Sequence, residues 1–217
     1  MAPGVQERQG KRRRALWIAL AVIVVLLIPV AFIAVPILTH RNSGESGQVA
    51  SGTAWPTEVT ATGADGRERS FTVSAADAAT PLDTSALSTG DRLVVSGTGY
   101  DAAQGIYVAI CRIPADASTK PGPCIGGVPD SAGEEVAEGT IQYAPSNWIN
   151  DAFAWKLFGS RSYDDEDAGT FTAYLEVGDP VSDDLDCTVD ACGIFTRNDH
   201  TALSDRVQDL YVPVDFS

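Results

Sequence analysis

Two short stretches of the sequence carry side chains that could bind a ligand or do chemistry. The first is residues 147–163, NWINDAFAWKLFGSRSY, with five aromatic residues: Trp148, Phe153, Trp155, Phe158 and Tyr163. Aromatic rings supply large, rigid contact surfaces, so this density is typical of a cleft for a flat apolar ligand or for a partner protein. We expect Trp148, Phe153, Trp155 and Phe158 to contact the ligand. The alternative is that these rings form the core of the segment itself.

The second stretch is residues 197–209, which contains Asp199, His200, Ser204 and two further aspartates, Asp205 and Asp209. A Ser–His–Asp arrangement can be drawn from these residues. A catalytic serine, however, needs a strained turn and an oxyanion hole, and the sequence has no G-x-S-x-G motif. We therefore expect a polar loop between two strands, in which Arg197 or Arg206 pairs with a carboxylate. No catalytic residue is predicted, and a hydrolase centred on His200 is the least favoured hypothesis.

Acidic side chains gather in two further loops, at Asp164–Asp167 and at Asp179, Asp183, Asp184 and Asp186. Calcium binds several carboxylate oxygens, so a cation site is one interpretation. An EF-hand loop counted from Asp164 would place Ala168 at position 5 and Leu175 at position 12, and neither can ligate calcium. We expect solvated charge runs, with no metal and no cofactor, and calcium remains the alternative.

Composition and charge limit the classes of partner. The chain has 217 residues, of which 44% are hydrophobic, and this excludes disorder throughout. Five basic residues and one acidic residue lie within residues 1–14, whereas residues 41–217 hold ten basic and 28 acidic residues, a net charge of −18. A domain with this negative charge repels the phosphate backbone of DNA or RNA, and nucleic acid is therefore excluded as a partner.

An uncharged apolar run, Ala15–Leu38, extends over 24 residues. A helix of this length reaches about 36 Å, and the hydrocarbon core of a bilayer is about 30 Å thick. A cleaved signal peptide is the alternative, but its apolar region spans only about 7–15 residues. We predict an uncleaved transmembrane helix at 15–38 in contact with the lipid bilayer of the plasma membrane. The basic tail at 1–14 then stays in the cytoplasm, and the C-terminal part lies outside the cell.

The rest of the chain is expected to form a flexible Gly/Ser-rich stalk at 39–54 and one folded ectodomain at 55–217. Alternating apolar residues and turn residues predict short strands, and residues 147–158 could hold one or two helical turns. The predicted strands are 58–62, 67–73, 92–96, 106–112, 169–177, 194–197 and 210–216. Residues 106–112, IYVAICR, are interpreted as buried on both faces. Short strands separated by turns indicate an all-β sandwich.

Four cysteines follow the predicted membrane segment: Cys111, Cys124, Cys187 and Cys192. Outside the cell disulfides persist, and four cysteines allow three connectivities. We expect neighbours to pair, Cys111 with Cys124 and Cys187 with Cys192. The first bridge would close 12 intervening residues and stabilise the fold by about 3 kcal/mol. A zinc site is the alternative, but only the second pair has a spacing close to that of zinc ligands.

Three stretches around the cysteines resemble the neocarzinostatin family of actinobacterial secreted proteins. Ser85–Cys111, SALSTGDRLVVSGTGYDAAQGIYVAIC, resembles the opening two strands of the family; Cys187–Cys192 resembles its short second disulfide loop, and Leu210–Phe216 its closing strand. Thr196–Val214 is more similar to a subgroup of actinobacterial surface proteins than to the antibiotic carriers. The resemblance covers residues 85–216.

This resemblance implies a seven-stranded immunoglobulin-like β-sandwich with two disulfides. In the best-known members a cleft beside the sheet holds an enediyne chromophore, and the first disulfide lies near its floor, which corresponds to Cys111–Cys124. The carriers place an aromatic residue two positions after the first cysteine, and this chain departs from them there with Ile113. Because it lies near the first bridge, Ile113 is included among the predicted ligand contacts. The expected function is a membrane-anchored, non-enzymatic binding module for a small hydrophobic ligand or a cell-envelope protein. A structural or assembly protein of the cell surface is the alternative.

Overall fold

The structure, a computed structural model, describes residues 3–49, 52–126 and 141–217. It divides the chain into two compact units, Met1–His40 and Arg41–Ser217. Parts of three predicted segments lie outside the described residues: positions 1–2 of the basic tail, 50–51 of the stalk and 127–140 of the ectodomain.

The first unit is a single helix, α1, Pro3–Thr39. Its segment Arg13–Ala31 has a mean hydropathy of 2.5 over 19 residues, so by length and composition it could cross a membrane. A signal sequence near an N-terminus has the same two properties. The helix continues through Pro29, which a helix tolerates when neighbouring groups satisfy the freed carbonyl.

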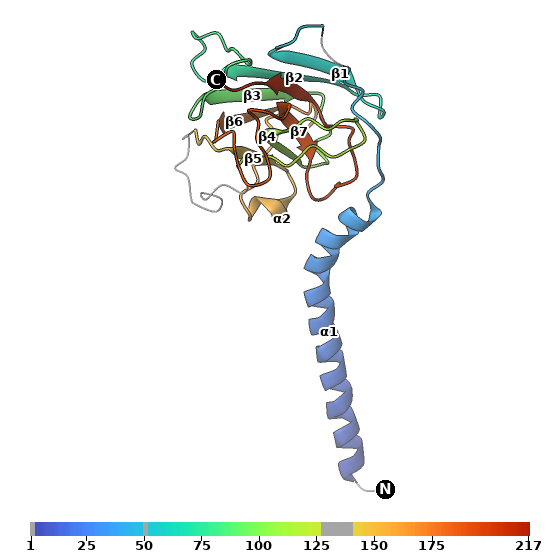
Figure 1. Cartoon of the computed structure of the whole chain (residues 1–217). Helices are drawn as coiled ribbons and strands as arrows, with labels where there is room; N and C mark the ends of the chain where they lie inside the picture. Colours follow the sequence, from blue (N-terminus) through green and yellow to red (C-terminus); the bar gives the residue numbers. More distant parts are fainter. Residues whose placement is uncertain (1–2, 50–51, 127–140) are drawn as a thin grey trace. The chain divides into compact units, whose positions relative to one another are not determined.

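The second unit is a sandwich of two antiparallel four-stranded sheets (Figure 1). One sheet has the order β1-β2-β3-β6, formed by Glu58–Thr62, Glu68–Ala75, Arg92–Thr98 and Phe171–Glu176. The other has the order β5-β4-β7-β8, formed by Ser146–Ile149, Ile106–Arg112, Cys192–Asn198 and Tyr211–Val214. The predicted all-β sandwich is confirmed. The described residues contain eight strands, one more than expected.

The core lies between the two sheets, where alternate residues of each strand point inward. In β6 the buried side chains are Phe171, Ala173 and Leu175, while the residues between them are partly exposed. In β4 the inward residues are Ile106, Val108 and Ile110, each at most 3% exposed. Burying one such side chain contributes about 1.5–3 kcal/mol, so the alternation fixes which face of each strand turns outward.

The additional strand is β5, which overlaps the start of the range 147–158 in which one or two helical turns were predicted. Ser146–Ile149 pairs antiparallel with β4, and Asn147 donates from Nδ2 to the carbonyl oxygen of Tyr174 in β6 at 2.8 Å. Helical structure in this region is confined to α2, Phe153–Lys156. The prediction of one or two helical turns within residues 147–158 is therefore confirmed by α2, whereas the start of this range belongs to β5, in which Asn147 and Ile149 are buried.

Part of the segment predicted as a flexible stalk lies against the sandwich. Glu45 forms a parallel bridge with Arg206, and the Asn42 side-chain amide donates to the carbonyl oxygen of Ser204 at 2.7 Å. Gln48 makes two 2.8 Å hydrogen bonds with the backbone of Tyr211 at the start of β8. Residues 42–48 are thus held by the folded unit.

Both disulfides join neighbours in the sequence, Cys111 with Cys124 and Cys187 with Cys192, and the predicted pairing is confirmed. Cys111 is fully buried at the end of β4, and Cys124 returns along it through an isolated bridge. The disulfide between Cys111 and Cys124 holds the loop between the two cysteines on the outer side of the second sheet.

Candidate functional site

Five rings form a continuous group on the outer face of the second sheet, and we call them the ring cluster: Tyr107, Trp148, Trp155, Phe158 and His200. The centroid of the His200 ring lies 4.6 Å from that of Trp155 and 5.2 Å from that of Trp148. The ring centroid of Tyr107 lies 5.9 Å from that of Trp148, and the ring centroid of Phe158 lies 6.2 Å from that of Trp155. These separations are those of packed aromatic pairs.

Strand register brings the rings together. Tyr107 of β4 is paired with Trp148 of β5 on one side and with Arg197 of β7 on the other. Cross-strand partners on one face of a sheet have Cβ atoms about 4.5–5.5 Å apart, so these three side chains are neighbours. Trp155 comes from α2, and His200 follows the end of β7 by two residues.

A buried carboxylate holds Trp148 in place. One oxygen of Asp199, Oδ2, accepts hydrogen bonds from Nε1 of Trp148 and from Nδ2 of Asn150, both at 2.8 Å. The other, Oδ1, accepts from the backbone N–H and the hydroxyl of Thr201. Gly105 makes room for this group, because a Cβ there would lie 2.0 Å from Oδ2 of Asp199. The site is therefore preorganised from within the fold.

Tyr107 and His200 are joined by a hydrogen bond of 2.9 Å between the phenol oxygen and Nδ1. Burial, with the nearby charge of Asp199, raises the pKa of Tyr107 to about 12, so the phenol is neutral at physiological pH. The guanidinium of Arg197 lies over the Tyr107 ring, 5.7 Å from its centroid, and donates from Nη1 to the carbonyl oxygen of Pro121 at 2.9 Å.

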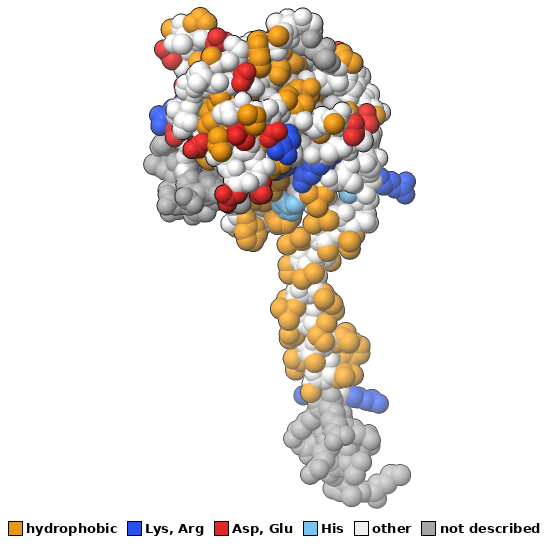
Figure 2. Space-filling view, in the orientation of Figure 1, with side chains coloured by type: hydrophobic (Ala, Val, Ile, Leu, Met, Phe, Trp, Pro, Cys, Tyr) orange, Lys and Arg blue, Asp and Glu red, His pale blue; other side chains and the backbone are white. Residues whose placement is uncertain are grey.

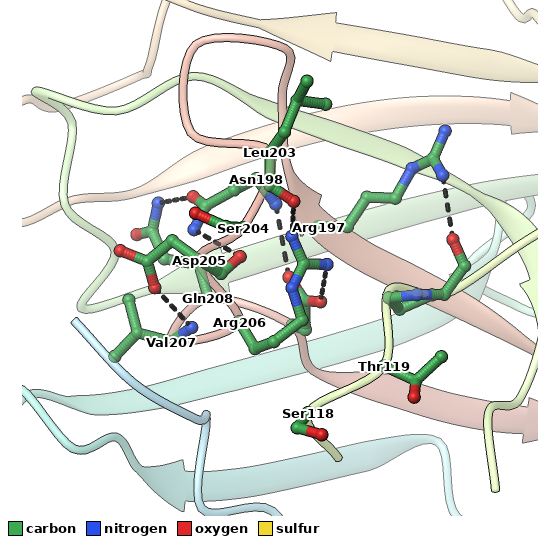
Figure 3. A network of polar contacts seen from close by, with 12 residues as sticks. Ser118, Thr119, Arg197, Asn198, Leu203, Ser204, Asp205, Arg206, Val207 and Gln208 are labelled. Atoms are coloured by element: carbon green, nitrogen blue, oxygen red, sulfur yellow. Dashed lines mark hydrogen bonds and ion pairs between the residues drawn. The ribbon is translucent and has the colours of Figure 1, made fainter. Parts of the chain in front are cut away.

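The loop that carries Asp199 and His200 is held by a buried polar network (Figure 3). Arg206 pairs with Asp209 and donates to the carbonyl oxygen of Leu203 at 2.6 Å. Asn198 donates to the carbonyl oxygen of Asp205 and accepts from Gln208 at 2.9 Å. The expected pairing of an arginine with a carboxylate in this loop is confirmed. Burial raises the pKa of Asp209 to about 7, although Arg206 favours the charged form.

A second apolar group lies on the same face of the sheet, around the first disulfide. Ala109, Cys111 and Phe195 are its buried members, and Ile113, Cys124 and Tyr211 pack against them. The rings of Phe195 and Tyr211 are stacked with their centroids 4.7 Å apart. Tyr107, Ala109 and Cys111 alternate along β4, so this disulfide group continues the outer face on which the ring cluster lies.

The structure brings together three of the five predicted ligand contacts. Trp148, Trp155 and Phe158 belong to the ring cluster, whereas Ile113 lies in the disulfide group. Phe153 is 78% exposed on α2 and belongs to neither group. Tyr163 is 5% exposed and packs on Phe171, so for this ring the alternative of a core position holds.

Sequence reasoning missed Tyr107, His200 as a ring partner, and the anchoring role of Asp199. Tyr107 lies in a strand that was interpreted as buried on both faces. The alternation of Tyr107, Ala109 and Cys111 in IYVAICR could have placed all three on one face. Nothing in the sequence indicates that Trp148 and Asp199 are neighbours. They are brought together because β5 and β7 both pair with β4.

The residues considered for hydrolysis do not form a triad. In the described part of the chain, Nδ1 of His200 is hydrogen-bonded to the hydroxyl of Tyr107, and the carboxylate of Asp199 accepts hydrogen bonds from Trp148, Asn150 and Thr201. Ser204 is exposed, and its carbonyl oxygen accepts a hydrogen bond from Asn42. This arrangement offers ring surface and fixed polar groups, not an activated nucleophile.

Outside the ring cluster, the structure offers a polar depression and the acidic loops. The depression is lined by charged and small side chains with no aromatic ring: Arg67, Asp101, Ala102, Ala103, Glu166 and Asp167. Across the residues that the structure describes, no group of three or more His, Cys, Asp or Glu is placed to hold a metal ion. Asp165 and Asp186 instead accept backbone hydrogen bonds within their own turns.

No family profile matches the chain. No curated protein matches it either. Among solved structures, macromomycin is similar with 16% identity and a TM-score of 0.35, over 68% of this chain and 99% of macromomycin. The fold assignment above rests on the strands and their register in this chain.

Proposed function

We propose that this protein is a membrane-anchored, non-enzymatic binding module at the cell surface, and that the ring cluster binds a small, flat, apolar ligand. The observation that carries the proposal is the fixed geometry of Trp148. Its indole is hydrogen-bonded to a buried carboxylate while its ring remains partly exposed among three other aromatic side chains and His200. Rings that are fixed before binding lose little conformational entropy when a ligand stacks on them.

The ligand class follows from the chemistry of the surface. Five rings supply contact area for a planar apolar molecule, and the Arg197 guanidinium beside Tyr107 supplies hydrogen-bond donors at one edge. The disulfide group, including Ile113, extends this apolar surface along β4.

The cellular location is part of the proposal. Helix α1 has the length and hydropathy of a membrane span, and the two disulfides suit an oxidising compartment outside the cell. The five basic residues before the apolar run favour a cytoplasmic N-terminus. The resemblance of Thr196–Val214 to actinobacterial surface proteins supports the same location.

The four tryptophans permit a direct test in one sample. We would titrate the full chain in nanodiscs with 2-naphthol, a planar apolar probe with one hydroxyl, and follow the four indole N–H signals by NMR. The expected result is a saturable shift of the Trp148 and Trp155 signals, while Trp55 and Trp17 stay in place. Trp55 is 41% exposed outside the ring cluster, and Trp17 lies in α1.

Two substitutions complete this test. Trp155→Leu should abolish the shift of Trp148, and Trp55→Leu should leave it unchanged. Equal shifts of Trp55 and Trp148 would show non-specific partition, and a response confined to Trp17 would show uptake by the lipid. Either result would contradict a binding site at the ring cluster.

A further inference from the structure

Helix α2 and the two residues after it expose three large apolar side chains. Phe153, Leu157 and Phe158 are 78%, 70% and 63% exposed, and we call them the apolar tip. Helix α2 has no buried residue, and it is attached to the sandwich mainly through the packing of Trp155 on Trp148 and His200. Hydrophobic side chains gather on the surface over α2 (Figure 2). Contiguous exposed apolar side chains of this size mark an interaction surface.

One loop of the second unit contacts both the helix that carries the apolar tip and the segment through which the polypeptide joins this unit. The loop with His200, which packs on Trp155, also holds the joining segment: Asn42 binds the carbonyl oxygen of Ser204, and the backbone N–H of Ser43 donates to Asp205 at 2.9 Å. His200 and Ser204 are four residues apart, a span of at most about 14 Å. Leu203, between them, is also 55% exposed.

The covalent chain limits how far this face can be from a bilayer that contains α1. Thr39 is the last residue of α1, and Asn42 is already bound to the folded unit. Three residues reach at most about 11 Å, which is comparable to the thickness of the headgroup region on one side of a bilayer. A tether this short keeps the second unit at a high effective concentration near the bilayer, so that even a weak contact with lipid is populated.

The local charge permits contact with lipid, although the ectodomain as a whole is strongly acidic. Lys156 is the charged residue of α2, and its Nζ lies 3.1 Å from Oδ1 of Asp151, so the carboxylate beside the apolar tip is paired. Arg41 precedes the joining segment. The acidic runs at 164–167 and 179–186 belong to other loops.

We infer that the apolar tip inserts into the interfacial region of the bilayer that holds α1, and so fixes one face of the sandwich against the membrane. The inference rests on the anchoring part of the proposed function. Insertion of the apolar tip would also place the ring cluster at the membrane surface, because Phe158 belongs to both the apolar tip and the ring cluster. An apolar ligand that is dissolved in the bilayer would then reach the rings without crossing water.

The test uses the full chain in liposomes of phosphatidylcholine brominated at carbons 6 and 7 of one acyl chain, because bromine quenches nearby tryptophan. Trp17→Phe removes the tryptophan of α1, so the remaining signal comes from Trp55, Trp148 and Trp155. We expect at least 1.5-fold quenching relative to unbrominated lipid. The triple variant Phe153→Ser/Leu157→Ser/Phe158→Ser in the same background should lose it.

A matched control replaces two exposed apolar residues elsewhere, Val181→Ser/Val189→Ser, which are 49% and 80% exposed. This control should keep the quenching. Equal quenching in the control and the triple variant, or none in the parent, would overturn the inference. So would a fluorescence change that depends on the protein-to-lipid ratio but not on bromine, since that result assigns the apolar tip to a second copy of the chain.

Carbonate extraction separates this inference from the anchor on which it rests. If alkaline carbonate releases the parent protein from the liposomes, both the anchor and the tip insertion fail. If the protein stays in the membrane and is not quenched, only the tip insertion fails. Near-UV circular dichroism of the triple variant should match the parent in the tryptophan region. The variant loses the Phe158 ring of the ring cluster, but Trp155 keeps its contacts with Trp148 and His200.

Discussion

Asp199 is the residue on which the geometry of the ring cluster depends. Its carboxylate is fully buried and accepts four hydrogen bonds, two of them from Trp148 and Asn150. In Asp199→Asn one of the two carboxylate oxygens becomes an NH₂ group, and the two donors that this oxygen served lose their acceptor. Each buried donor that is left without a partner costs about 1–3 kcal/mol. We expect a loss of about 2–4 kcal/mol in the free energy of unfolding.

Urea unfolding of the full chain in a mild detergent, followed by near-UV circular dichroism of the packed rings, measures this loss. Asp183→Asn is the matched control, since Asp183 is exposed and should change stability by less than about 0.5 kcal/mol. A loss of the same size in both variants would show that Asp199 has no special role.

The phenol of Tyr107 gives the ring cluster a signature in alkaline solution. The ordinary pKa of tyrosine is 10.0, and burial raises that of Tyr107 to about 12. The folded state therefore holds this proton more tightly than the unfolded chain does. The resulting stabilisation is complete below about pH 10 and is lost as the pH rises towards 12.

A spectrophotometric titration at about 295 nm, wild type minus Tyr107→Phe, isolates this phenol from the other five tyrosines. We expect the difference signal to rise with a midpoint near pH 12. A midpoint near pH 10 would mean that Tyr107 is open to water and is not packed between Trp148 and His200.

At the scale of elements, the two disulfides should differ in their contributions. The bridge between Cys111 and Cys124 spans 13 positions, and the bridge between Cys187 and Cys192 spans five. The loss of chain entropy grows with loop length, so removing the first bridge by paired Cys→Ala substitutions should cost about 3 kcal/mol and removing the second about 2 kcal/mol. Urea unfolding of the two double variants compares them, and a larger loss for the shorter bridge would contradict this account.

Gly105, one residue before β4, tests the packing of that strand against the loop after β7. A Cβ at this position would meet Oδ2 of Asp199 at 2.0 Å and Nδ2 of Asn150 at 2.3 Å, neither of which can move without breaking its hydrogen bonds. Gly105→Ala should destabilise the fold by about 1–3 kcal/mol and shift the Trp148 indole signal. Gly52→Ala, where no atom lies within 4 Å, is the control and should have no effect.

The elements that the sequence predicts well are runs of apolar and β-branched residues that are bounded by turn residues. Strands β1 and β4 match their predicted bounds, and β3 and β6 match within two residues. Strand β5 has only four residues, too few for a pattern, and its pairing with β4 depends on residues about forty positions away. The ring cluster was difficult to predict for the same reason, because Trp148 lies in β5.

At the scale of the whole molecule, the docking of residues 42–48 makes the folded unit longer than the predicted ectodomain. A fragment starting at residue 55 lacks the hydrogen bonds of Asn42, Ser43 and Gln48. Each hydrogen bond contributes about 0.5–1.5 kcal/mol, so the 55–217 fragment should be about 2–4 kcal/mol less stable than the 41–217 fragment.

Thermal and urea unfolding of the two fragments measure this difference, and Gln48→Ala in the longer fragment should reproduce about 1–2 kcal/mol of it. Equal stabilities would show that the segment contributes nothing to the fold. The same result would weaken the short-tether argument, because a free segment of sixteen residues would allow the domain to lie far from the bilayer.

The central claim is that the ring cluster binds a small apolar ligand, and native mass spectrometry of the full chain, purified from its own membrane in detergent, tests it most directly. We expect the added mass of a bound small molecule, present in wild type and Trp55→Leu and absent in Trp155→Leu. An apo mass in wild type, with both disulfides formed and the near-UV spectrum of packed rings intact, would contradict the claim.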